Sequence, residues 1–92
     1  MNVIIEQLKA ARQAMDLTQS EVGKKLGLPQ SHVSKIEQGG TDPRLSTVSD
    51  MARVLDQELV LVPRQLLSQV RALLQGEKEH ERRWQLDEED EV

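Results

Sequence analysis

The sequence predicts an all-α fold, a small domain of five helices with one short C-terminal strand. Apolar residues recur at intervals of three and four through most of the chain, which is the spacing of one face of a helix. Aromatic residues make up 1% of the composition, so the core must be built from aliphatic side chains, which suits closely packed helices. The chain has 92 residues, enough for one domain and an appendage.

The first two helices are predicted by an apolar stripe and by a capping pattern. The first helix is expected over residues 3–14, and its stripe consists of Ile4, Leu8, Ala11 and Met15. The second helix begins after Thr18, because Thr18 and Glu21 have the spacing of a capping box. It ends at Gly27, a residue that readily adopts the left-handed conformation found after helices. Gly23 lies inside this helix, where glycine costs roughly 1 kcal/mol relative to alanine, so we expect another part of the backbone to approach it closely.

A proline and a pair of glycines bound the third helix. Pro29 suits a helix start, because the N–H that it lacks is not needed in the first turn. The third helix is expected over residues 30–38, with Val33 and Ile36 buried, and Gly39-Gly40 ends it. A fourth helix follows the next proline, and its apolar positions are Leu45, Val48, Met51, Ala52 and Leu55.

After the fourth helix the pattern changes to that of a strand. Residues 58–62 are rich in valine and leucine, and Pro63 ends the run. A single apolar strand in a helical domain has an unpaired edge, so we expect it to pair with the same strand of a second copy across a two-fold axis. Residues 64–75 return to a helical spacing that is rich in large apolar residues, which also indicates a homodimer interface. The predicted dimerisation residues are Leu59, Val60, Leu61, Val62, Leu66 and Val70.

The charges are distributed unevenly along the chain. The formal net charge is −4, yet residues 1–74 carry nine lysines and arginines against eight acids, whereas residues 75–92 carry three against eight. The first part is therefore close to neutral and can still present a basic face. The predicted divisions are residues 1–56, a helical domain; residues 57–76, the dimerisation strand and helix; and residues 77–92, an acidic tail. Trp84, in this tail, is expected either to pack on the dimer or to bind a partner protein.

The composition also excludes several classes of protein. The chain has no cysteine, which excludes disulfides, thiolate nucleophiles and zinc–thiolate sites. The longest apolar run, Leu59–Val62, is too short for a membrane span or a secretory segment, so we expect a cytoplasmic protein. The sequence contains no metal-ligand set, no catalytic triad and no glycine-rich phosphate loop. We therefore predict no metal, no cofactor, no small-molecule substrate and no enzymatic activity.

The second and third helices have the lengths and the spacing of a helix-turn-helix. Each has about two turns, and Gly27-Leu28-Pro29 joins them. In such a motif the first helix lies across the DNA backbone and the second places its N-terminal polar residues in the major groove. The residues of suitable type are Gln30, Ser31, Ser34 and Lys35. Gln19 begins the first helix of the motif, where it can bond a phosphate. The alternative is that two short polar helices occur in a small α protein that binds no nucleic acid.

The stretch from Leu8 to Gly40 resembles the Cro/phage-repressor (Xre) helix-turn-helix family. The resemblance covers about residues 5–56 and rests on the pattern Arg12…Leu17-Thr-Gln…Leu26-Gly…Val33-Ser-x-Ile36-Glu37…Gly39. It implies a phage-repressor-like fold in which residues 1–56 are a DNA-binding domain, and a homodimer that binds double-stranded operator DNA and represses transcription. The DNA-binding residues are expected to be Gln19, Gln30, Ser31, His32, Ser34, Lys35, Gln38 and Arg12.

The same resemblance implies an ion pair between Arg12, on the first helix, and Glu37, at the end of the third. A carboxylate at the C-terminal end of a helix is unfavourable by itself, so a cationic partner is expected there. The pair would fix the third helix against the first; the alternative is that Arg12 faces a phosphate. The chain departs from the family at two positions: Pro29 replaces the usual serine or threonine cap of the recognition helix, and Asp56 replaces the glycine that usually ends the fourth helix.

A strand directly after the fourth helix resembles the HipB-type antitoxins. In that group the strand pairs with its dimer mate, and the antitoxin binds both operator DNA and a HipA-like kinase toxin. The resemblance implies a type II toxin–antitoxin system, in which the chain regulates its own operon and neutralises the toxin by binding it. Two alternatives stay open: a stand-alone Xre-family regulator or controller protein without a toxin, and an adaptor that has kept the fold and lost DNA binding.

Overall fold

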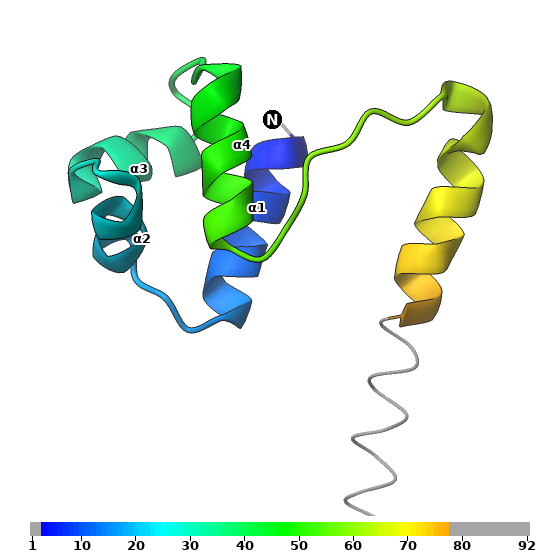
Figure 1. Ribbon diagram of the computed structural model, residues 1–92, viewed down its shortest axis with the longest axis horizontal. Helices are drawn as coiled ribbons and strands as arrows, with labels where there is room; N and C mark the ends of the chain where they lie inside the picture. Colours follow the sequence, from blue (N-terminus) through cyan, green and yellow to red (C-terminus); the bar gives the residue numbers. More distant parts are fainter. Residues whose placement is uncertain (1–2, 78–92) are drawn as a thin grey trace, which may run out of the picture. The chain divides into compact units, whose positions relative to one another are not determined.

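The computed structural model describes residues 3–77. Its elements, in chain order, are α1 (Val3–Ala14), α2 (Gln19–Leu26), α3 (Gln30–Glu37), α4 (Leu45–Val54) and a 3-10 turn, η1 (Arg64–Leu66), which leads into a helix over residues 67–77 (Figure 1). The chain divides into two compact units, Met1–Leu59 and Val60–Val92. All helices predicted within residues 3–77 are confirmed, and the fold is all-helical over this range.

The first unit is held together by one aliphatic core. In this unit α3 packs against α1 and α2, and α4 packs against α2. The buried core residues are Ile5, Leu8, Val22, Val33, Ile36, Val48, Met51, Ala52 and Leu55. Since Val33 and Ile36 are almost fully buried, α3 is anchored by one face and turns its other face to solvent.

The inward face of α1 differs from the predicted stripe. Ile5 and Leu8 are buried, whereas Ile4 and Met15 are exposed. The prediction that Ile4 and Met15 belong to the apolar face of this helix was therefore wrong. The face that carries Ile5 and Leu8 continues to Arg12, one turn further along α1. Arg12 is turned inward because it bonds a carboxylate on α3, a contact that hydrophobic periodicity does not reveal. Leu45, the first apolar position of the predicted fourth helix, is also exposed.

Local signals set the ends of α2. The capping box is confirmed: the Thr18 hydroxyl accepts from the backbone N–H of Glu21 at 3.1 Å, and the Glu21 carboxylate accepts from the backbone N–H of Thr18 at 3.0 Å. Gly27 follows α2 in the left-handed region, with φ of 72°. Gly23 meets the expected close backbone approach, because a Cβ built there would lie 2.5 Å from the carbonyl oxygen of Leu28.

Both departures from the family pattern are visible in the backbone. Pro29 precedes α3 and provides no side-chain cap, in agreement with the sequence. Asp56 adopts the left-handed conformation, with φ of 58°, which the family usually assigns to glycine. Asp16 does the same between α1 and α2, with φ of 57°, and this second position was not predicted.

The segment between α4 and η1 forms no strand in the described chain. Residues 57–63 have neither helical nor strand structure, so the predicted strand and its pairing across a dimer are not shown. A strand requires a neighbour with which to share its backbone hydrogen bonds, and a single chain offers none to this segment. Pairing with a second copy therefore stays a prediction.

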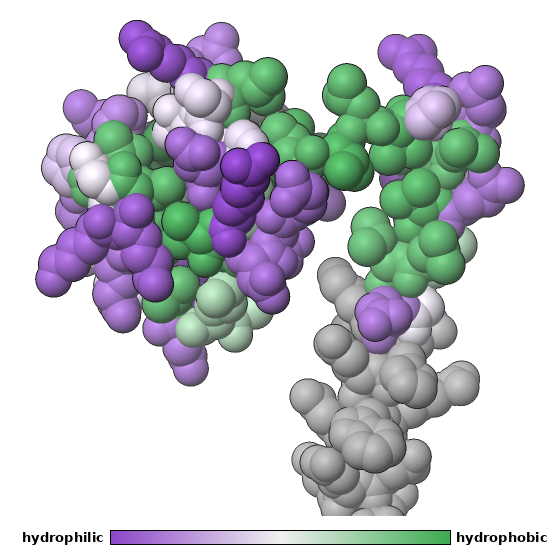
Figure 2. All heavy atoms as spheres, viewed as in Figure 1, coloured by the Kyte–Doolittle hydropathy of each residue, from purple (hydrophilic) through white to green (hydrophobic). Residues whose placement is uncertain are grey.

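The second unit exposes a large apolar surface. Leu61, Leu66, Leu67, Leu73 and Leu74 are all exposed, and no residue from 60 to 77 is buried. Figure 2 shows the apolar residues, in green, along η1 and the following helix. Trp84 and all of the predicted acidic tail except Glu77 lie outside the described residues. None of the helices within residues 3–77 combines the length and the hydropathy needed to traverse a lipid bilayer.

Candidate nucleic-acid interface

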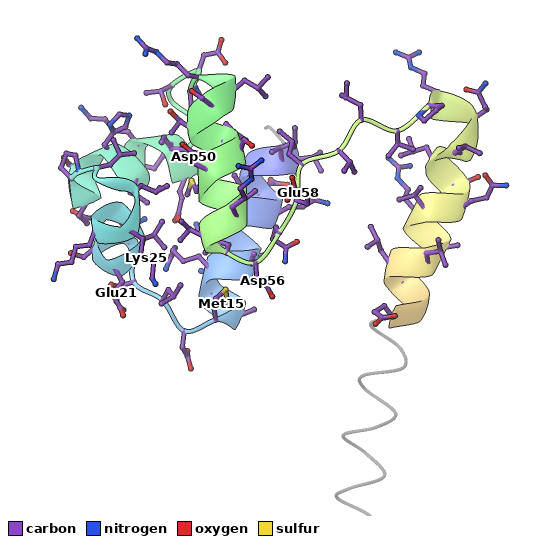
Figure 3. All side chains as sticks on the ribbon, in the orientation of Figure 1. Met15, Glu21, Lys25, Asp50, Asp56 and Glu58 are labelled. Carbon is purple, nitrogen blue, oxygen red and sulfur yellow. The ribbon has the colours of Figure 1, made fainter. Side chains whose placement is uncertain are left out.

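The outer face of α3 is polar and carries no exposed carboxylate. Gln30, Ser31, His32, Lys35 and Gln38 are exposed, and Ser34 is half-buried. Glu37 is the only acid within α3, and it is 3% exposed. The exposed acids of the first unit include Asp50 on α4 and Asp56 and Glu58 in the segment after it (Figure 3). The surface of α3 is therefore compatible with an anionic ligand.

The predicted ion pair between α1 and α3 is present and partly buried. Arg12 Nε donates to Glu37 Oε2 at 2.7 Å, and Arg12 Nη2 donates to Glu37 Oε1 at 3.0 Å. A third donor of the same guanidinium, Nη1, bonds the backbone carbonyl of Leu17 at 2.7 Å. The side chains of Arg12 and Glu37 are 12% and 2% exposed. The guanidinium thus holds together α1, α3 and the segment before α2, which favours the structural role over a phosphate contact.

Two glutamines extend this ion pair to the surface of α3. Gln19 Nε2 donates to Glu37 Oε1 at 3.0 Å, and Gln30 Nε2 donates to Gln19 Oε1 at 2.7 Å. We call Arg12, Glu37, Gln19 and Gln30 the four-residue network. All four residues were predicted from the sequence as DNA contacts or as the ion pair, but the bonds that join the glutamines to the ion pair were not predicted. Each glutamine is the first residue of its helix. This shared position was the one feature of the sequence that could have indicated that their side chains lie close together.

The charge on Glu37 is stabilised within this network. Burial by itself raises the pKa of Glu37, but hydrogen bonds from Arg12 and Gln19 and the positive charges of Arg12 and Lys9 outweigh burial, so the pKa lies below its ordinary value of 4.5. At neutral pH the group is therefore a carboxylate, which only accepts hydrogen bonds. Among the described residues, no buried side-chain nitrogen or oxygen lacks a hydrogen-bond partner.

A second hydrogen bond lies further along α3. Gln38 Nε2 donates to Ser34 Oγ at 3.2 Å, so these two predicted contact residues are joined one helical turn apart. The structure thus pairs Gln30 with Gln19 and Ser34 with Gln38, while Ser31, His32 and Lys35 lie exposed beside them. Residues 3–77 contain no group of three or more histidines and acids positioned to hold a metal ion.

The predicted dimerisation residues are divided between the two units. Leu59 is half-buried against the core of the first unit, and Val60 and Leu61 are exposed. In the second unit Leu66 is exposed and Val70 is half-buried, as is Val62 before them. The structure thus leaves most of this set accessible to a partner.

Comparison with known proteins defines the class. The helix-turn-helix family model matches residues 8–62, more than half of the chain, and the chain belongs to this family. The matched segment contains the Thr18 capping box, the Gly27 turn and the whole of α3. The family assignment that the motif predicted is therefore confirmed.

Two similar proteins illustrate the family. One is "Uncharacterized HTH-type transcriptional regulator y4dL" of Sinorhizobium fredii (strain NBRC 101917 / NGR234), 45% identical over 71 residues, which are 77% of this chain and 36% of that protein. Another is "Antitoxin HigA1" of Mycobacterium tuberculosis (strains CDC 1551 / Oshkosh and ATCC 25618 / H37Rv), 42% identical over 59 residues, which are 64% of this chain and 40% of that protein. The chain thus spans well under half the length of these relatives. No solved structure matches it significantly.

Proposed function

We propose that this chain is a sequence-specific DNA-binding transcriptional regulator that places the outer face of α3 in the major groove. The observation that carries the proposal is the polar face of α3, which is free of exposed acids and is braced against α1 and α2 by the four-residue network. Family membership and the relative named a transcriptional regulator support it. Repression is the form of regulation that the resemblance to phage repressors implies.

In this proposal the contacts have separate roles. Gln30 bonds the edge of an adenine, Lys35 reaches guanine acceptors, and Ser31 and Ser34 bond whichever base presents a suitable group. Gln19, at the start of α2, bonds a phosphate next to the free N–H groups of its helix. Burial of Val33 and Ile36 gives α3 a fixed orientation, which such readout requires.

We also propose that the regulator is a homodimer that uses residues 57–77. Within residues 60–77 nothing is buried, and an isolated helix of this length is marginal in water. A second copy would cover the apolar face and give residues 58–62 a strand partner. Two copies of α3 would then read two half-sites related by a two-fold axis.

Selection of duplexes from a random DNA library tests this function. The full chain is mixed with duplexes of random sequence, and bound duplexes are recovered and sequenced at 150 mM salt. We expect enrichment of an inverted repeat, because a two-fold dimer reads two equivalent half-sites. Binding that enriches no sequence, and that is lost uniformly as salt rises, would contradict sequence-specific recognition.

A second candidate function is that of an antitoxin. The relative named antitoxin HigA1 supports it, and the resemblance to HipB-type antitoxins names a HipA-like kinase as the toxin. The test is co-expression of the tagged chain with the product of the adjacent reading frame. An antitoxin should co-purify with that product and restore growth that the product alone arrests. Absence of both effects would favour the stand-alone regulator.

A further inference from the structure

Glu37 is a buried charged group on α3, and the proposed DNA contacts of the outer face of α3 do not use it. Its Oε2 accepts from Arg12 Nε at 2.7 Å. Its Oε1 accepts from Arg12 Nη2 and from Gln19 Nε2, both at 3.0 Å. A carboxylate has no hydrogen to donate, so every group that faces it must present a donor.

The need for a donor beside Glu37 fixes the orientation of the Gln19 amide, which in turn fixes that of the Gln30 amide. A side-chain amide has a donating and an accepting end, and the two orientations fill nearly the same space. Glu37 makes Gln19 turn its Nε2 inward, which leaves Gln19 Oε1 to face α3. Gln30 must then turn its own Nε2 toward Gln19, as the 2.7 Å bond between them shows. One acceptor-only group thus selects the orientation of both amides.

We propose that Glu37 is a positioning residue that determines which base Gln30 prefers, by fixing the orientation of the Gln30 amide. A glutamine recognises adenine by accepting from N6 and donating to N7, and the adenine presents those two atoms in a fixed order across the groove. With Nε2 anchored on Gln19, the amide of Gln30 offers its second hydrogen and its Oε1 in a single order. The reversed amide would place an acceptor opposite N7 and a donor opposite N6. The inference rests on the proposed DNA-binding function.

The Glu37→Gln variant tests this directly, because it keeps the size of the side chain and adds a donor. Arg12 donates to both carboxylate oxygens, so the new nitrogen faces one Arg12 donor whichever way the amide turns, and it faces Gln19 only from the Oε1 position. With the nitrogen at the Oε1 position, Gln19 must present its Oε1 and the amide of Gln30 reverses. With the nitrogen at the Oε2 position, both glutamines keep the wild-type orientation, so the variant no longer selects a single order. A bidentate contact discriminates between bases by about 5- to 150-fold. We expect Glu37→Gln to weaken this preference at the base read by Gln30, because part of the population carries the reversed amide.

The measurement uses the full chain and the duplex that the wild-type protein selects. The base read by Gln30 is the position at which the Gln30→Ala variant loses its preference. Dissociation constants are then measured for duplexes with adenine, with 7-deazaadenine, which lacks the N7 acceptor, and with guanine at that position. The ratio of the constants is the readout, because a loss of folded protein or of phosphate contacts weakens all three duplexes alike.

Two further variants separate orientation from folding. Gln19→Met breaks the link while leaving the pair of Arg12 and Glu37 intact, so it should lose the adenine preference even where Glu37→Gln fails to fold. Arg12→Lys weakens the ion pair but leaves a cation beside the carboxylate, so it should retain the preference despite lower stability. Gln7→Met removes an exposed amide from α1 and is the matched control.

The outcomes are distinct. Loss of the adenine ratio in Gln19→Met and its reduction in Glu37→Gln, with retention in Arg12→Lys, supports the assignment. A folded Gln19→Met protein that keeps the wild-type ratio overturns it while leaving sequence-specific binding in place. A wild-type protein that selects no sequence overturns the proposed function itself, and the inference with it.

Discussion

Arg12 makes three hydrogen bonds, and two of them go to a carboxylate that is almost fully buried. Arg12→Ala would leave Glu37 as a buried charge with only Gln19 to bond it. Removal of one partner of a buried pair costs roughly 3–5 kcal/mol, a large share of the stability of a small domain. We expect a loss of this size in the free energy of unfolding, measured by urea titration with circular dichroism. A loss of less than about 1 kcal/mol would show that solvent screens the pair.

Glu37, the carboxylate partner of Arg12, makes the stability of the protein depend on pH. Because the folded state lowers the pKa of Glu37 below 4.5, its stabilisation is present above that value and is lost as pH falls through the native pKa. Glu37→Gln lacks this contribution at every pH. The difference in unfolding free energy between wild type and Glu37→Gln should therefore be largest near neutral pH and shrink in acid. A difference that stays constant between pH 6 and pH 2 would contradict ionisation in the folded state.

The proposed contact of the outer face of α3 with DNA is tested by removing single side chains from that face. Gln30→Ala and Lys35→Ala should each weaken binding to the selected duplex by roughly 1–3 kcal/mol, because each removes contacts to a base edge. Fluorescence anisotropy measures both dissociation constants, with Gln7→Ala on α1 as a neutral control. If both variants bound that duplex as tightly as wild type, α3 would not be the recognition helix.

At the scale of the element, local signals were predictable from the residues alone, whereas the one side-chain contact between helices that was predicted, the Arg12–Glu37 ion pair, was implied by the family resemblance. The Thr18 capping box and the Gly27 turn involve residues a few positions apart, so the sequence sufficed to place the ends of α2. The bond between Gln19 and Gln30 depends on how α2 and α3 cross, which periodicity does not describe. The face of α1 was misassigned because hydrophobic periodicity leaves out Arg12, which turns inward to a carboxylate 25 positions away.

The angle between α2 and α3 depends on the absence of a side chain at Gly23. A Cβ there would lie 2.5 Å from the carbonyl oxygen of Leu28, in the turn between α2 and α3. Gly23→Ala must therefore shift the backbone, and overpacking of this kind costs roughly 1–3 kcal/mol. The free energy of unfolding should fall by that amount, and specific DNA binding should weaken at temperatures where the protein is still folded.

Gly40→Ala is the matched control for this prediction. Gly40 lies after α3, and nothing lies within 4 Å of a Cβ built there. Its stability should change by less than about 0.5 kcal/mol, as for other surface substitutions. Equal effects of the two substitutions would show that the close approach at Gly23 does not constrain the helix-turn-helix.

At the scale of the whole molecule, the sequence predicted a second chain that a single chain does not display. The run of apolar residues over 58–62 predicted a strand, yet residues 57–63 form none here. A strand needs a neighbouring strand, which in the proposed dimer would come from the second copy. On the last helix and the turn before it, the leucines are exposed and Val70 is half-buried, and their role in dimerisation stays a prediction. The proposed dimer accounts for both observations with one interface.

Substitution of two leucines with similar exposure distinguishes the proposed dimer interface from the rest of the surface. Leu73 is 75% exposed on the last helix, on the face that also carries Leu66 and Val70, and Leu45 is 73% exposed at the start of α4. Leu73→Glu would bury two unpaired carboxylates in the proposed dimer, which should weaken it by roughly 3 kcal/mol or more. Leu45→Glu should leave the dimer intact. Analytical ultracentrifugation of both variants and the wild type measures the dissociation constants. A wild-type chain that stays monomeric at micromolar concentration, or a dimer that tolerates Leu73→Glu as well as Leu45→Glu, would place the interface elsewhere or remove it.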